Sequence, residues 1–196
     1  MMPKALNQMT VPDLPVAEVL ALARSLGCVG VELRNDLGRA LFDGLAPATM
    51  KTMAANAGLR ILAVAEVKAF NIAPTTKLHT TRDLIETAAA AGAEAVALIP
   101  QVGSTVMDRK DQQAALRDAL TVSMPLLNDP GIIGLIEPLG FAASTLRHKE
   151  DAAAVLDSLG NPDTLKIVHD TFHHHLSGDT ANYPDITGLV HISGVT

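Results

Sequence analysis

In the stretch Ser25-Leu26-Gly27-Cys28-Val29-Gly30-Val31, an amphipathic segment ends at a glycine and gives way to a short apolar run. The same change recurs at Gly58, Gly92, Gly131 and Gly160, with spacings of 31, 34, 39 and 29 residues. Glycine often ends a helix because it has no side chain to clash in the left-handed conformation needed there. Each repeat has the length of one helix plus one strand, which predicts a parallel sheet with repeated crossovers.

Caps and apolar periodicity place the elements within this repeat. Asp13 is predicted to cap a first helix with an apolar stripe from Val16 to Leu26, and Pro47 suits the first turn of a second helix. Pro125 is expected to end a fourth helix. The remaining predicted helices cover about residues 81–91, 111–122 and 149–159, and the predicted strands cover about 5–8, 29–33, 60–66, 95–99, 132–136, 165–169 and 189–192.

These elements favour a single (β/α)8 TIM-barrel domain over residues 1–196. The apolar run Ala95-Val96-Ala97-Leu98-Ile99 fits a strand that is covered on both faces. A doubly wound Rossmann sheet is the runner-up, but no G-x-G-x-x-G motif follows the first strand. Such barrels have eight strands in about 250 residues. We therefore expect the eighth strand and the last helix to lie beyond Thr196.

Composition excludes several classes of protein. With 48% hydrophobic and 18% charged residues, the chain can bury a substantial core. It has neither an apolar run of about 20 residues nor a signal-peptide core, which predicts a cytoplasmic protein without membrane contact. The net charge of −6 and the lack of a basic run argue against nucleic acid as a partner. Cys28 is expected to be a small buried strand residue. The sequence leaves open whether the protein forms a homo-oligomer.

Three of the predicted strands end in residues that can hold a metal. Glu137, Asp170 and His191 each follow or close an apolar run. The carboxyl ends of parallel barrel strands lie on one side of the barrel, where active sites form. A set of oxygen and nitrogen ligands suits one divalent ion, namely Mn²⁺, Mg²⁺, Co²⁺, Zn²⁺ or Fe²⁺.

Strand alternation predicts which way these side chains point. If Glu137 faces the barrel interior, Leu135 and Ile133 do so too, and Ile136 faces the helices. By the same count Asp170 points inward with Val168, whereas His169 points outward and is expected to be structural. His174 and His175 are expected to be solvated loop residues, and His79 an exposed residue near a helix start.

Four motifs carry a resemblance to a known family. They are Gly30-Val31-Glu32-Leu33-Arg34, Ile136-Glu137-Pro138-Leu139-Gly140, His169-Asp170-Thr171-Phe172-His173 and Val190-His191-Ile192-Ser193. Together they resemble the xylose isomerase-like TIM-barrel superfamily of sugar isomerases and epimerases, to which a family of abasic-site endonucleases is related. The closest likeness is to the 2-keto-myo-inositol (inosose) isomerase type, which would place the chain in carbohydrate or inositol metabolism.

The resemblance implies a metal held by a glutamate, an aspartate, a histidine and a second glutamate. Glu137, Asp170 and His191 match the first three, and the fourth would lie on the eighth strand, which this sequence does not contain. It implies proton transfer in a keto-sugar or inosose through a metal-stabilised enediolate. Glu137 would be the proton-transferring carboxylate or its neighbour, and His173 would bind a substrate oxygen.

Two further strand-end carboxylates, Glu32 and Glu66, are expected to point into the same cavity. With Arg34 and Lys68 they are candidate substrate-binding residues, and ion pairing among the four is the structural alternative. Phe70, Phe141 and Phe172 are expected either to line a sugar pocket or to pack in the core.

Three other functions stay open for this pattern. An inosose dehydratase-type lyase would use the same metal. An abasic-site endonuclease-like protein would need a basic, aromatic-bearing surface, which the acidic balance, the lack of Trp and the single Tyr183 argue against. The third is a sugar-binding relative without turnover.

Overall fold

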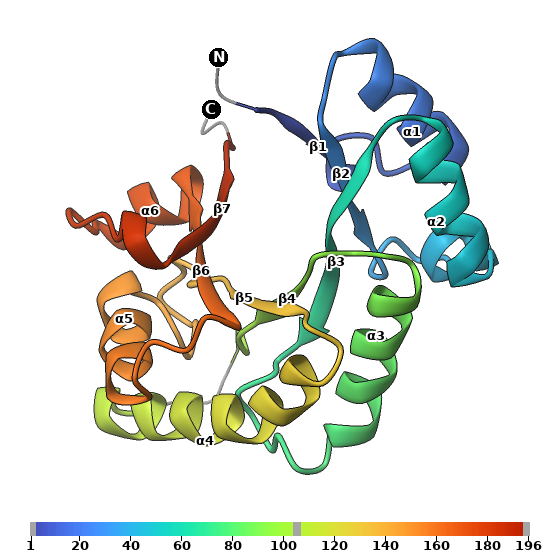
Figure 1. Cartoon of the computed structure of the whole chain (residues 1–196). Helices are drawn as coiled ribbons and strands as arrows, with labels where there is room; N and C mark the ends of the chain where they lie inside the picture. Colours follow the sequence, from blue (N-terminus) through green and yellow to red (C-terminus); the bar gives the residue numbers. More distant parts are fainter. Residues whose placement is uncertain (1–2, 104–106, 194–196) are drawn as a thin grey trace.

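In the described part of the chain, the sheet contains seven parallel strands, each paired with its neighbours in sequence. The computed structural model describes residues 3–103 and 107–193. The strands curl into an arc with the helices outside it (Figure 1). A Rossmann sheet would order its strands differently, so the barrel prediction is confirmed. The strands are β1 (Ala5–Asn7), β2 (Gly30–Arg34), β3 (Arg60–Lys68), β4 (Ala95–Ile99), β5 (Ile133–Ile136), β6 (Leu165–Asp170) and β7 (Thr187–His191).

The helices connect successive strands, as the glycine repeat predicted. Short 3-10 turns are found at η1 (Gln8–Thr10), η2 (Leu41–Gly44) and η3 (Pro184–Ile186). The α-helices are α1 (Val16–Ser25), α2 (Pro47–Asn56), α3 (Leu78–Ala90), α4 (Arg109–Asn128), α5 (Lys149–Ser158) and α6 (Thr171–Ser177). In the described part of the chain, no helix is both long and apolar enough to cross a bilayer.

Apolar side chains form two layers, one on the inner face of the sheet and one on its outer face. The inner layer is small and contains Leu135 and Val168, with Ile133 packed against it. The outer layer lies between the sheet and the helices and includes Ile136. The predicted alternation is therefore confirmed, and it directs Glu137, the residue after β5, to the interior.

The predicted cap of the first helix is wrong. Pro15 precedes α1 without a side-chain cap, and the backbone N–H of Val16 instead donates to Oδ2 of Asp43, 2.5 Å away. Asp43 is 27 residues away in sequence. Such a long-range acceptor satisfies the same free helix N–H as a local cap, so Asp13 is not needed there.

Pro125 does not end the fourth helix, because α4 continues to Asn128. A proline inside a helix costs about 3 kcal/mol. The turn that follows it contains Leu126 and Leu127, which are 8% and 0% exposed. Burying a leucine contributes about 1.5–3 kcal/mol, so two of them offset the lost hydrogen bond.

The segment after β6 was predicted as a loop, but it forms helix α6. Asp170 caps this helix by accepting the backbone N–H of His173, and Gly178 ends it in the left-handed conformation. His174 and His175 are therefore helical residues. Cys28 was also misplaced, because it precedes β2, is partly exposed and closes α1 with its N–H.

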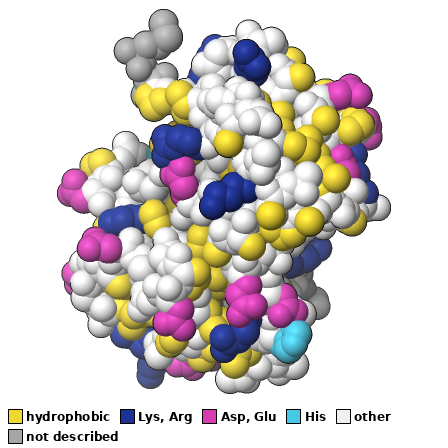
Figure 2. Space-filling view, turned by 45° about the vertical axis from the view of Figure 1, so that its right-hand side comes forward, with side chains coloured by type: hydrophobic (Ala, Val, Ile, Leu, Met, Phe, Trp, Pro, Cys, Tyr) yellow, Lys and Arg dark blue, Asp and Glu magenta, His cyan; other side chains and the backbone are white. Residues whose placement is uncertain are grey.

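The arc is open between β1 and β7, which are not paired with each other in the residues described. A cavity of about 800 Å³ lies inside it, lined by residues of both strands. Its wall includes Glu32, Glu137 and His191. On the outer face shown in Figure 2, acidic and basic side chains are interspersed with apolar ones.

Candidate metal centre

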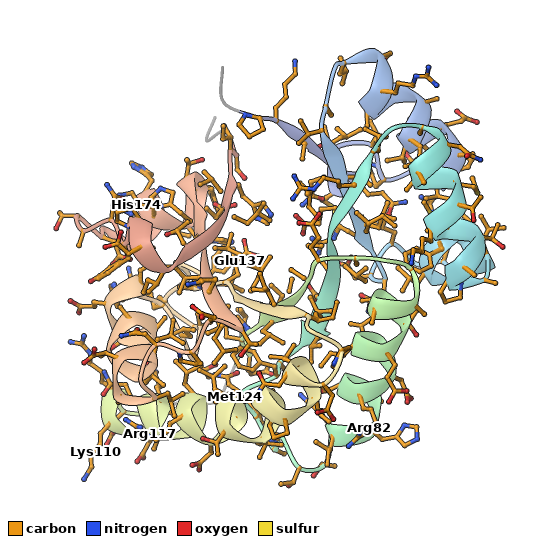
Figure 3. The ribbon with its side chains drawn as sticks, in the orientation of Figure 1. Arg82, Lys110, Arg117, Met124, Glu137 and His174 are labelled. Atoms are coloured by element: carbon orange, nitrogen blue, oxygen red, sulfur yellow. The ribbon has the colours of Figure 1, made fainter. Side chains whose placement is uncertain are left out.

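Three neighbouring strand ends bring the predicted metal ligands together. Glu137 follows β5, Asp170 ends β6 and His191 ends β7. The register of β6 and β7 sets Asp170 directly beside His191. One ligand atom from each of the three residues lies within 4.8 Å of the others. Glu137 and Asp170 are each 7% exposed, and Figure 3 shows Glu137 pointing into the interior.

His191 lies among three carboxylates. Its Nδ1 is 3.1 Å from Oε1 of Glu137 and 3.7 Å from Oδ2 of Asp170, and its Nε2 is 2.7 Å from Oε2 of Glu32. Burial alone would lower the pKa of His191, but the hydrogen bonds and charges of Glu137 and Glu32 raise that pKa to about 10. These carboxylates therefore favour a positive charge at their centre.

Asp170 divides its two oxygens between two tasks. Oδ1 accepts the backbone N–H of His173 at 2.9 Å, which fixes the start of α6. Oδ2 accepts the hydroxyl of Ser193 at 3.1 Å and faces His191. One oxygen is thus structural, and the other is presented to the site.

His173 lies on α6 and packs against two aromatic rings. Its ring centroid is 5.1 Å from that of Phe141 and 5.0 Å from that of Phe172, both edge to face. Nδ1 of His173 is buried without a hydrogen-bond partner in the described residues. Burial lowers the pKa of His173 against the opposing charges of Asp170 and Glu137. The imidazole is therefore neutral near pH 7 and has a hydrogen-bonding position left.

Arg34 is held by carboxylates, as the ion-pairing alternative predicted. Its Nε and Nη2 donate to Asp36 at 2.8 and 2.7 Å, and Nη2 also reaches Glu66 at 3.2 Å. Nη1 is 4.0 Å from Oε1 of Glu32. Burial raises the pKa of Glu66, with the charge of Asp36 adding to the effect and that of Arg34 opposing it.

The candidate substrate-binding residues are only partly brought together. Glu32 and Arg34 line the cavity. Glu66 is outside the lining and forms an ion pair with Arg34. Lys68 is exposed, and neither it nor His173 belongs to the cavity lining among the described residues. Their predicted contacts with substrate stay predictions.

The remaining predicted residues are placed as follows. His169 points outward, as predicted, and its Nδ1 is 3.0 Å from Nζ of the buried Lys149, which also contacts His174 on α6. The His79 side chain is 86% exposed. Phe70 packs in the outer core, whereas Phe141 and Phe172 flank His173.

Sequence reasoning missed Asp36, Ser193 and the pairing of Glu32 with His191. Asp36 had a local signal, since it lies two residues after the arginine that it binds. The other two contacts join distant segments and leave no local pattern.

Two carboxylates and one imidazole in a buried cluster fit one divalent ion. Carboxylate oxygens and imidazole nitrogens are ligands for Mn²⁺, Mg²⁺, Co²⁺, Zn²⁺ and Fe²⁺. Glu137, Asp170 and His191 would hold such an ion, and the spacing of their ligand atoms is compatible with one common position.

Comparison with known proteins agrees with the barrel fold. The family model described as a xylose isomerase-like TIM barrel matches residues 20–196. No curated protein sequence matches the chain. A xylose isomerase domain containing protein from Salmonella typhimurium LT2 is 30% identical, with a TM-score of 0.89 over 100% of this chain and 74% of that protein.

Two more distant structures share the fold. The IolI protein with a bound zinc atom is 17% identical, with a TM-score of 0.84 over 97% of this chain and 72% of that one. A 3-keto-D-glucoside 4-epimerase from E. coli is 16% identical, with a TM-score of 0.77 over 98% of this chain and 80% of that one.

Proposed function

The chain belongs to the xylose isomerase-like TIM barrel family, and we propose that it is a divalent-metal-dependent isomerase or epimerase of a keto-sugar or an inosose. The observation that carries the proposal is the convergence of Glu137, Asp170 and His191 at adjacent strand ends. The zinc atom of the IolI structure and the epimerase named among the similar structures support it.

The proposed reaction moves a proton beside a carbonyl. A divalent ion at the three ligands would acidify the carbon-bound proton next to a chelated carbonyl. Glu137 would accept this proton as the C–H bond breaks, while the electron pair moves into the carbon–carbon bond of an enediolate. Return of this proton to the former carbonyl carbon, with transfer of the hydroxyl proton to the former carbonyl oxygen, would give the isomer. Delivery of a proton to the opposite face of the original carbon by a second donor would give an epimer.

Four other residues would hold the substrate, and among them Arg34 lines the cavity in the described part of the chain. His173 is neutral and its buried Nδ1 lacks a partner in the described part of the chain, so it would hydrogen-bond a reacting oxygen. Arg34, Glu66 and Lys68 would contact hydroxyl groups. The cavity of about 800 Å³ is within the size range of small-molecule sites.

Solvent exchange tests this proposal directly. The protein loaded with Mn²⁺ or Co²⁺ is incubated in deuterated water with a panel of keto-sugars and inososes, and deuterium beside the carbonyl is measured. Glu137→Gln should reduce the exchange by at least about 100-fold if its carboxylate takes the proton. Glu86→Gln is the matched control, since Glu86 is an exposed residue of α3 outside the cavity lining, and it should leave the exchange unchanged.

His173→Ala should lower turnover more than metal affinity, because His173 is proposed to bind substrate. If metal binds and no member of the panel gains deuterium, the isomerase proposal is wrong. Release of water from an inosose would then point to the lyase, and binding without any reaction would point to a sugar-binding protein.

A further inference from the structure

A fourth carboxylate, Glu32 on β2, contacts the candidate metal ligands from across the cavity. Glu32 is only 4% exposed, although it is a charged residue. Its Oε2 is 2.7 Å from Nε2 of His191, 159 residues away in sequence. β2 and β7 are not neighbours in the sheet, so the contact spans the interior of the arc.

The two nitrogens of the His191 ring face different partners. Nδ1 faces Glu137 and Asp170, whereas Nε2 faces Glu32. An ionised carboxylate only accepts hydrogen bonds, so Nε2 carries a hydrogen in this arrangement. A neutral imidazole has one N–H, and the other nitrogen then offers its lone pair.

We propose that Glu32 is a positioning residue of the metal site, which holds the hydrogen of His191 on Nε2 and thereby presents Nδ1 to the ion. The inference rests on the proposed function, since it concerns the same site. A carboxylate behind a metal-binding histidine fixes the tautomer and the ring orientation and makes the ligand nitrogen more basic. Glu32 therefore acts through His191, in place of the substrate contact predicted from its strand end.

Glu32 is itself held in place. Its second oxygen, Oε1, is 4.0 Å from Nη1 of Arg34. Arg34 is in turn anchored by a two-pronged contact with Asp36 and by Glu66, and its backbone N–H donates to Gln8. This chain of contacts limits the rotation of Glu32, which a positioning role requires.

Metal affinity is the first test. The protein and its Glu32→Leu and Glu32→Gln variants are titrated with Zn²⁺ or Co²⁺ against a competing chelator. Glu32→Leu removes the acceptor and should weaken binding by about 10–100-fold. Glu32→Gln keeps the size and one acceptor oxygen, so it should fold and show a smaller loss. Glu66→Gln is the matched control for one lost negative charge in the same cluster, and it should weaken binding least.

The tautomer of His191 is the second readout and does not depend on activity. Proton–nitrogen NMR of the histidine rings, in protein loaded with Zn²⁺, should show a hydrogen on Nε2 of His191 protected from exchange. In Glu32→Leu this protection should be lost. Thermal unfolding of each variant establishes that it is folded.

The possible results separate the two proposals. If Glu32→Leu binds metal as tightly as the unchanged protein and keeps the same protected Nε2 hydrogen, the role of Glu32 is wrong while the metal site stands. If His191→Ala binds metal as tightly as the unchanged protein, the metal site itself is wrong, and with it the proposed function. If Glu66→Gln weakens metal binding as much as Glu32→Leu does, the loss comes from the general negative charge of the cluster. That result would also overturn the positioning role of Glu32.

Discussion

Substitutions of Asp170 can separate its role in capping α6 from its proposed role in metal binding. Its Oδ1 accepts the backbone N–H of His173 and caps α6, while Oδ2 faces His191. Asp170→Asn keeps an oxygen that can cap the helix and removes the charge. Asp170→Ala removes both. The two variants therefore differ mainly in the cap, and each should bind a divalent ion far more weakly than the unchanged protein does.

The size of the difference follows from the capping bond. Loss of a helix N-cap costs about 0.5–2 kcal/mol, typically about 1 kcal/mol. For a chain of 196 residues, about 1 kcal/mol corresponds to a difference of about 2–4 °C in Tm. We expect Asp170→Ala to unfold at the lower temperature by this amount, measured without metal so that ligand binding does not contribute.

Thermal and urea unfolding of the two variants measure this difference, and a metal titration measures the other function of the residue. Equal stability of the two variants would show that the cap does not hold α6 in solution. Metal binding by Asp170→Asn as tight as that of the unchanged protein would show that Asp170 is not a ligand.

Three further predictions concern α6, pH and the metal. A methyl group at Gly140 would overlap the carbonyl oxygen of His173 and lie 2.8 Å from the backbone N of Ser177. Gly140→Ala should therefore destabilise the protein by about 1–3 kcal/mol in urea unfolding. The control Ala142→Ser, on the exposed loop, should leave the stability unchanged. Burial raises the pKa of Asp179, but hydrogen bonds from the backbone N–H of Lys149 and from His148 hold that pKa below its usual value. The stabilisation that ionised Asp179 gives the fold is therefore present above about pH 4 and is lost as the pH falls through the pKa of the folded state. The difference in unfolding free energy between the unchanged protein and Asp179→Asn should shrink over the same pH range. A divalent ion at about 100 times its Kd should stabilise the protein by about 2.7 kcal/mol in thermal unfolding but leave His191→Ala unchanged.

The barrel could be predicted because its signals are local. Each glycine of the repeat marks a helix end on its own, and Ala95–Ile99 was placed with both strand ends correct. Asp13 and Pro125 misled for a different reason. A long-range acceptor, Asp43, took the place of the cap, and burial of the leucines after Pro125 outweighed the proline.

Helix α6 shows where local signals compete. Its sequence contains a β-branched threonine and three histidines, which are moderate helix formers. Seven residues make less than two turns. The capping signals at Asp170 and Gly178 were present, but Asp170 was already assigned to the metal. The structure shows that one carboxylate can supply both a helix cap and a candidate ligand oxygen, because its two oxygens point different ways.

The convergence of the three candidate ligands could be predicted from the sequence, but the charge balance around them could not, because it depends on how the arc closes. Glu32, Asp36, Glu66, Glu137 and Asp170 form one connected cluster with Arg34 and His191. Five carboxylates thus share two cationic side chains. When a divalent ion takes the place of the proton on Nδ1 of His191, the same cluster gains one unit of positive charge. The excess of carboxylates therefore favours a doubly charged ion over a proton at the centre of the cluster. This charge balance explains why Glu32 is buried there without requiring that it contact the substrate.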